Sequence, residues 1–149
     1  MTLCIAWIRH DVDKKELVMA TDSRLTGGES WDNGVKLFEL PRQDCLLCFA
    51  GDTARAYPLI LNTIASLKLD KGLASPHTDI HDILEYLIEL FSKLVAEVKE
   101  MAGNPDEMRS GAEFLFGGWS WKKQQFGIWR LYYNPALKAF THEAIDQGM

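Results

Sequence analysis

Short apolar runs separated by polar stretches occupy the first fifty residues, a pattern typical of β-strands. Residues 3–7 and 16–20 are strand-like, and the polar stretch 9–15 between them predicts a β-hairpin. Antiparallel pairing of these strands would return Asp22, at the end of the second strand, to Thr2 at the start of the first. Two more apolar runs, 34–40 and 45–50, predict further strands before a helix that begins near Ala54.

Helical spacing replaces this pattern in the middle of the chain. Residues 54–69 and roughly 78–101 are the two long helical patterns. The second pattern has a stripe that predicts a core-facing surface rather than a functional one, formed by Ile83, Leu84, Leu87, Ile88, Phe91, Leu94, Val95 and Val98. Three strand-like segments follow, at 112–121, 125–133 and 137–145. With 149 residues, the pattern predicts one α+β domain over 1–149.

Composition and charge exclude several classes of partner and binding site. A net charge of −5 without a basic patch argues against nucleic acid as a partner, and no apolar run is long enough to span a membrane. No glycine-rich phosphate loop appears, so no cofactor is expected. Cys45 and Cys48 are interpreted as buried free thiols, and His77 and His81 as exposed residues at a helix start, so no metal is expected. With no secretory leader, the expected location is cytoplasmic.

Thr2 is the first candidate for chemistry, because it follows Met1 and is small enough for that methionine to be removed by an aminopeptidase. Removal would leave one residue with a hydroxyl nucleophile and an α-amine, whose usual pKa of about 7.7–8.0 suits a general base. Threonine at position 2 is also commonplace and can be chemically idle. The hypothesis therefore depends on partners that the fold must supply.

Lys36 and Gly51 are the candidate partners beyond Asp22. Lys36 stands in a strand-like run, and a buried lysine needs a partner. If it meets Asp22, its ammonium would lower the pKa of a nearby amine and hydroxyl and stabilise an alkoxide; an exposed strand lysine is the alternative. Gly51 would let backbone N–H groups form an oxyanion hole, or simply make a turn capped by Asp52 or Thr53.

Four segments of the sequence follow one another in a characteristic order. They are Thr2 with Ile5-Ala6, Ala20-Thr21-Asp22-Ser23-Arg24, Val35-Lys36-Leu37 and Phe49-Ala50-Gly51-Asp52-Thr53-Ala54. In this order they resemble the N-terminal half of a proteasome β-type subunit. The family includes bacterial relatives such as the HslV peptidase and belongs to the N-terminal nucleophile hydrolases. The resemblance implies a threonine-type peptidase with Thr2 as nucleophile, Asp22 and Lys36 as its charged pair, and Gly51 at the oxyanion hole.

The resemblance also implies a substrate and partners. The substrate would be a peptide or an unfolded protein, bound by Arg24, Leu25, Phe49, Asp52 and Thr53. Subunits of this family assemble into stacked rings, so a homo-oligomeric ring is expected here, with an unfoldase as a possible partner. The alternative function is a noncatalytic ring or scaffold subunit that retains Met1.

The fold implied by the resemblance is an αββα sandwich, with two sheets face to face and helices on both outer sides. The later Ser-Gly element of the family has no match before Met149, and both long helical patterns correspond to helices on one sheet. We therefore expect one outer helical layer to be missing or incomplete, and the C-terminal part of the domain to be lacking. Candidate contact residues for oligomerisation are Phe114, Phe116, Trp119, Trp129 and Tyr132.

Overall fold

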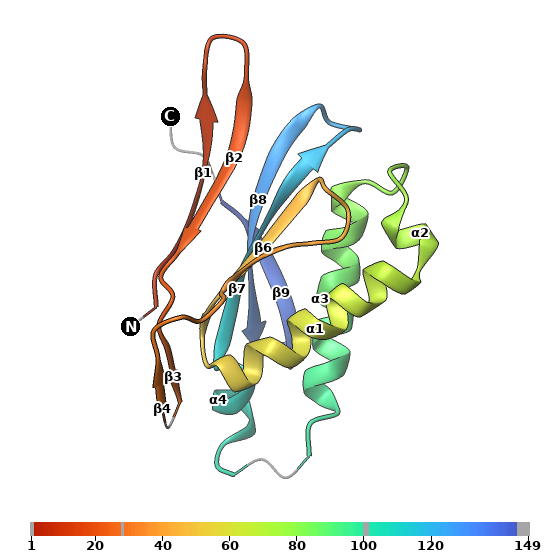
Figure 1. Ribbon diagram of the computed structural model, residues 1–149. Helices are drawn as coiled ribbons and strands as arrows, with labels where there is room; N and C mark the ends of the chain where they lie inside the picture. The colour runs from red at the N-terminus through yellow and green to blue at the C-terminus, as the bar shows by residue number, and fades with distance from the viewer. Residues whose placement is uncertain (1, 28, 100–101, 146–149) are drawn as a thin grey trace.

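The computed structural model describes residues 2–27, 29–99 and 102–145, and these form three layers (Figure 1). A five-stranded antiparallel sheet lies in the middle, with a two-stranded hairpin on one side and the two long helices on the other. The architecture is α+β, which confirms the coarser part of the fold prediction. Among the described residues, no helix is both long and apolar enough to cross a membrane.

The predicted N-terminal hairpin consists of β1 (Cys4–His10) and β2 (Lys15–Thr21). Along β1, half-buried and exposed side chains alternate, as expected when one face of a hairpin lies against another layer. The outward face carries Leu3, Ile5 and Trp7, which are 59%, 43% and 43% exposed. A short second hairpin, β3 (Leu25–Gly27) with β4 (Glu29–Trp31), was not predicted.

The central sheet has the strand order β5-β6-β7-β8-β9. Its strands are β5 (Leu37–Glu39), β6 (Cys45–Gly51), β7 (Ala112–Ser120), β8 (Gln125–Asn134) and β9 (Ala139–Ala144). The sequence predicted the last four strands closely. It overestimated the first, because residues 34–36 precede the three residues that pair with β6.

Both long helices, α1 (Thr53–Leu69) and α3 (Ile80–Ala96), pack on the same face of this sheet, as expected (Figure 1). Asp52 caps α1 by accepting a hydrogen bond from the Ala54 N–H at 2.9 Å. The α3 stripe is largely buried, but α3 ends before Val98, which is 40% exposed. The predicted helix extended to 101, and residues 100–101 lie outside the described part of the chain.

Two short helices complete the described elements. They are α2 (Lys71–Ala74) and α4 (Pro105–Arg109), and neither was predicted. Each begins at a polar cap, Asp70 for α2 and Asn104 for α4, whose side chains accept backbone N–H hydrogen bonds. They are too short to show a helical period in the sequence.

A pair of glycines on β7 lets both outer layers approach the central sheet. A Cβ at Gly117 would lie 2.7 Å from Met19 Cε on the hairpin, and one at Gly118 would lie 2.5 Å from Ile80 Cδ1 on α3. Successive residues of a strand point to opposite faces, so each glycine admits one layer. The Gly117 contact brings β2 close to the sheet, and β2 in turn pairs with β1, the strand that follows Thr2.

The proposed aromatic contact surface is wrong for its central members. Phe114, Phe116 and Trp129 are 1%, 0% and 6% exposed, because they face the helices and belong to the core. Trp119 and Tyr132 are half-buried. Alternation along β7 and β8 did not reveal which face the helices cover; the stacking of the layers decides it.

Candidate active site

Lys36 joins Thr2 and Asp22 into one cluster. Its Nζ lies 3.3 Å from Thr2 Oγ1 and 3.1 Å from Asp22 Oδ1, and both contacts have hydrogen-bond geometry. Lys36 is only 2% exposed, so the inward orientation holds and the exposed-lysine alternative is wrong. The cluster brings three of the predicted catalytic residues together. Met1, whose removal was predicted, lies outside the described residues.

The N-terminal hairpin positions two members of this cluster. Beyond the last paired residues, the Asp22 N–H donates to the Leu3 carbonyl, and the Leu3 N–H donates to Asp22 Oδ1, each at 3.1 Å. These bonds fix the backbone next to Thr2 by the pairing that the sequence predicted. The third member is held by β6, because the Phe49 N–H donates to the Lys36 carbonyl at 3.2 Å.

The Asp22 carboxylate is ionised near neutral pH. The Lys36 hydrogen bond holds the pKa of Asp22 below its usual range, although burial opposes this, and the Leu3 N–H lowers the pKa further. The Asp22 side chain is 32% exposed, whereas that of Lys36 is 1% exposed. Asp22 therefore stays ionised and balances the buried ammonium, whose N–H groups remain directed at the Thr2 hydroxyl.

Gly51 ends β6 in a conformation that glycine favours. Its φ is +111°, and a Cβ at this position would lie 2.3 Å from the Gly111 carbonyl oxygen. The next residue, Asp52, donates its N–H to that same carbonyl at 2.7 Å and caps α1. The turn explains why glycine stands here, and the role of Gly51 as an oxyanion donor stays a prediction.

Three of the five predicted substrate-binding residues, Leu25, Asp52 and Thr53, line a cavity of about 580 Å³. Its other walls include Trp31 and Tyr57, which the sequence argument missed. Tyr57 lies one helical turn after Thr53, a spacing that could have identified it. Trp31 gave no such indication, because the β3–β4 hairpin was not predicted.

The cavity is joined to the cluster through Tyr57. Its hydroxyl donates a 2.9 Å hydrogen bond to the carbonyl of Val35, the residue before Lys36. On the other side of the same segment, the Gly34 N–H donates to the Ser23 carbonyl at 2.7 Å, and Ser23 follows Asp22. A ligand in this cavity would therefore contact Tyr57, whose hydroxyl is bonded to the segment that carries Lys36.

The other two predicted substrate residues lie elsewhere. Phe49 is fully buried and packs edge-on against Tyr57 at 5.6 Å between ring centroids, so its side chain offers no surface to a substrate. Arg24 is exposed and its Nε forms a 2.8 Å ion pair with Asp32. Neither lines the cavity. Phe49 was selected for its position in a motif, and its place on the helix-facing side of β6 explains its burial.

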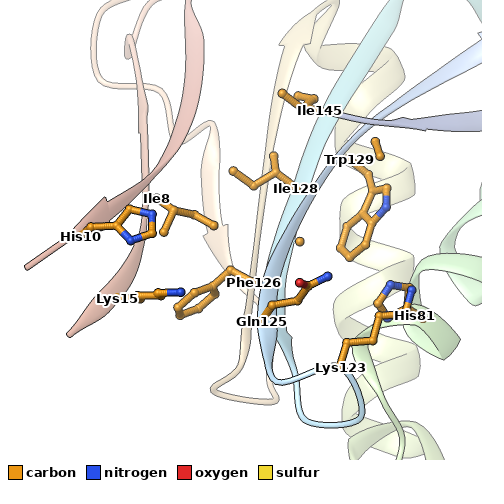
Figure 2. Close-up of a pocket in the computed structure, with 12 residues that line it drawn as sticks. Ile8, His10, Lys15, His81, Lys123, Gln125, Phe126, Ile128, Trp129 and Ile145 are labelled. Carbon is orange, nitrogen blue, oxygen red and sulfur yellow. The ribbon is translucent and has the colours of Figure 1, made fainter. Parts of the chain in front are cut away.

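A second cavity, of about 400 Å³, lies at the opposite end of the hairpin (Figure 2). Basic side chains from several elements line it, including His10, Lys15, His81 and Lys123, above a floor that includes Trp129. Thr2 precedes the first residue of β1, whereas His10 is the last residue of that strand. This cavity is therefore separate from the cluster around Lys36.

No protein-family model matches the chain, and no curated protein matches it. A hydroxyl, a buried ammonium and a carboxylate in hydrogen-bond contact can stabilise an alkoxide. A primary amine beside that hydroxyl would complete a nucleophile and its base.

Proposed function

We propose that the protein is a threonine-type peptidase of the N-terminal nucleophile class, with Thr2 as nucleophile after removal of Met1. The observation that carries the proposal is the position of Lys36 Nζ, between Thr2 Oγ1 at 3.3 Å and Asp22 Oδ1 at 3.1 Å. A lysine–aspartate pair alone could have a purely structural role. Catalysis is favoured because the buried ammonium also contacts the hydroxyl of Thr2, the residue that follows the removable methionine.

In the proposed reaction, the free α-amine of Thr2 takes the proton from its own Oγ1 as Oγ1 attacks the peptide carbonyl carbon. The Lys36 ammonium stabilises the alkoxide that develops at Oγ1. The proton on the amine then passes to the departing amino group as the C–N bond breaks. Water attacks the resulting ester, gives one proton to the amine, and releases the acid while Oγ1 is protonated again.

Asp22 and Gly51 have supporting roles in this proposal. Asp22 neutralises the buried ammonium and holds its orientation, so Lys36 can point at Oγ1 without leaving an unpaired charge in the core. Gly51 would offer a backbone N–H to the carbonyl oxygen that becomes negative in the tetrahedral intermediate. Its positive φ supports a close approach of backbone at this turn.

The cavity walls favour a substrate with a bulky apolar side chain. Leu25, Trp31, Tyr57 and Pro58 supply apolar surface around a space of about 580 Å³. Trp31 is 63% exposed, so it can lie against a bound side chain. An extended segment of an unfolded protein can present such a side chain, whereas a folded protein keeps most of them buried.

We also propose that the layers correspond to an αββα sandwich in which the hairpin begins the second sheet, and that subunits form a ring in the cytoplasm that works with an unfoldase. The exposed row formed by Leu3, Ile5 and Trp7 supports a buried contact on the outer face of the hairpin. Enclosure in a ring would keep folded proteins away from an otherwise unselective nucleophile.

Turnover of a fluorogenic peptide with an aromatic or leucine side chain before the cleaved bond tests the proposed function. The wild-type protein should cleave it, Thr2→Ala should not, and Thr2→Ser should retain part of the activity. Thr141→Ala, which removes a hydroxyl from β9, is the matched control and should behave as wild type. Equal turnover by wild type and Thr2→Ala would refute the assignment of Thr2 as the nucleophile.

Intact mass on the same samples decides between the two functions of the family. Loss of one methionine residue is expected in the active protein. Complete retention of Met1, together with no turnover, would favour the noncatalytic ring or scaffold subunit.

A further inference from the structure

Cys4 and Cys48 face each other across the boundary between the hairpin and the central sheet. The Cys4 Sγ donates to the Phe49 carbonyl at 2.7 Å, and Phe49 directly follows Cys48 on β6. The two cysteines are 44 positions apart in the sequence, on β1 and β6. Both thiols are free.

Alternation along β6 explains why these two residues meet. Cys45, Leu47 and Phe49 belong to the cluster packed beneath the helices, so residues between them face the hairpin. Cys48 is one of these and is fully buried. On β1, Cys4 is half-buried on the sheet-facing side. The third cysteine, Cys45, points toward the helices instead.

The two thiols differ in reactivity. The Cys48 hydrogen bond lowers the pKa of Cys4, and the Lys36 ammonium adds to this, whereas burial and Asp22 oppose it. The same contact and burial raise the pKa of Cys48. Cys4 is therefore the thiol that forms a thiolate more readily, and it is also the more accessible to a small oxidant.

We propose that Cys4 and Cys48 are a modification site at which a peroxide forms a reversible disulfide between the hairpin and the central sheet. The Cys4 thiolate attacks one peroxide oxygen, the O–O bond breaks, and Cys4 becomes a sulfenic acid while the other oxygen leaves as hydroxide, which takes up a proton to become water. The Cys48 sulfur then attacks the Cys4 sulfur, the S–O bond breaks, and the thiol proton leaves with the hydroxide as water. Two electrons pass from the thiols to the peroxide, and a dithiol reductant reverses the change.

The bond would act close to the proposed nucleophile. Cys4, the first residue of β1, follows Thr2 by two positions, and Cys48 precedes Gly51 by three on β6. A covalent link here would shift the two backbone segments that flank the reacting atoms, so oxidation should lower peptide turnover. This consequence rests on the proposed function, whereas formation of the disulfide does not.

Peptide mapping after exposure of the full chain to hydrogen peroxide tests the proposal. The expected product is a cross-linked peptide pair containing Cys4 and Cys48, with an intact mass lower by two hydrogen atoms. The denatured chain should then have one titratable thiol in place of three. Dithiothreitol should restore all three and, if the proposed function is correct, the peptide turnover that oxidation lowered.

Two variants keep the test specific. Cys45→Ser should cross-link as wild type does, while Cys48→Ala should give a Cys4 sulfenic acid that reacts with dimedone. Should Cys48→Ala fail to fold, the wild-type peptide map decides alone. The proposal would be overturned by a disulfide that involves Cys45. It would also be overturned if peroxide left all three thiols of the wild type free, or oxidised Cys4 without a cross-link. Cross-linking in a protein without any peptide turnover would uphold the disulfide and count only against the proposed function.

Discussion

Lys36 Nζ lies 3.3 Å from Thr2 Oγ1, although 34 positions separate the two residues. The contact joins the hairpin layer to the segment that precedes β5. It depends on Asp22, whose carboxylate pairs with the same ammonium at 3.1 Å.

Lys36→Met should abolish peptide turnover while leaving the protein folded. Methionine fills a similar volume without a charge, and the partly exposed Asp22 can be hydrated after the change. Loss of a group that stabilises the developing alkoxide should lower kcat/KM by about 10³-fold, which is roughly 4 kcal/mol. Lys15→Met, at an exposed position on β2, is the control. Kinetics with unfolding curves for both variants check this, and normal turnover by Lys36→Met would remove the lysine from the mechanism.

Asp79→Ala should destabilise the protein by about 3 kcal/mol near pH 7, through loss of a helix cap and of hydrogen bonds to a buried carboxylate. Asp79 is 1% exposed and accepts hydrogen bonds from Ser120 Oγ at 3.0 Å and from the backbone at the start of α3. Urea unfolding measures the change. Glu89→Ala, exposed on the same helix, should have little effect.

The effect of Asp79 should depend on pH in a defined direction. Burial alone would raise the pKa of Asp79, but hydrogen bonds from His81, Lys122 and Ser120 hold it below its usual range. A lowered folded pKa means that the stabilisation is fully present above the unfolded value of about 3.9 and declines as the pH falls below it, through the folded value. The gap in stability between wild type and Asp79→Ala should narrow over that acid range. A gap that widens there would contradict the assignment.

Thr53→Trp should fill the cavity beside α1 and change substrate preference. With the space of about 580 Å³ reduced, peptides with phenylalanine or leucine before the cleaved bond should lose about 10-fold or more in kcat/KM, and alanine peptides should lose less. Leu61→Trp, at an exposed position of the same helix, is the control. Equal losses for large and small side chains would mean that this cavity does not select the substrate.

Trp7→Lys should weaken self-association of the protein. Leu3, Ile5 and Trp7 form an exposed apolar row on the hairpin, and a charge at its end opposes burial in a contact. Light scattering after size exclusion should show an oligomer for the wild type and a smaller species for the variant. Val12→Lys, at the exposed hairpin tip, should remain as large as the wild type. A wild-type monomer at micromolar concentration would contradict the ring.

The sequence predicted the parts of this fold that depend on local pattern. Alternation and turn residues gave the hairpin, and antiparallel pairing alone brought Asp22 back to Leu3 next to Thr2. The inward orientation of Lys36 could not be predicted from the sequence, because burial is decided by the stacking of layers. For the same reason, the contact between Cys4 and Cys48 and the burial of Phe49 could not be predicted: strand alternation defines two faces without saying what covers each one.

The most direct test is covalent labelling by a peptide β-lactone, which acylates a reactive hydroxyl. Intact mass and peptide mapping should show one adduct per chain, on Thr2, in protein that has lost Met1. Thr2→Ala and Lys36→Met should remain unlabelled under the same conditions, while Lys15→Met is labelled as wild type. Absence of the adduct from wild type that lacks Met1, or equal labelling of Thr2→Ala, would contradict the claim that Thr2 is the nucleophile.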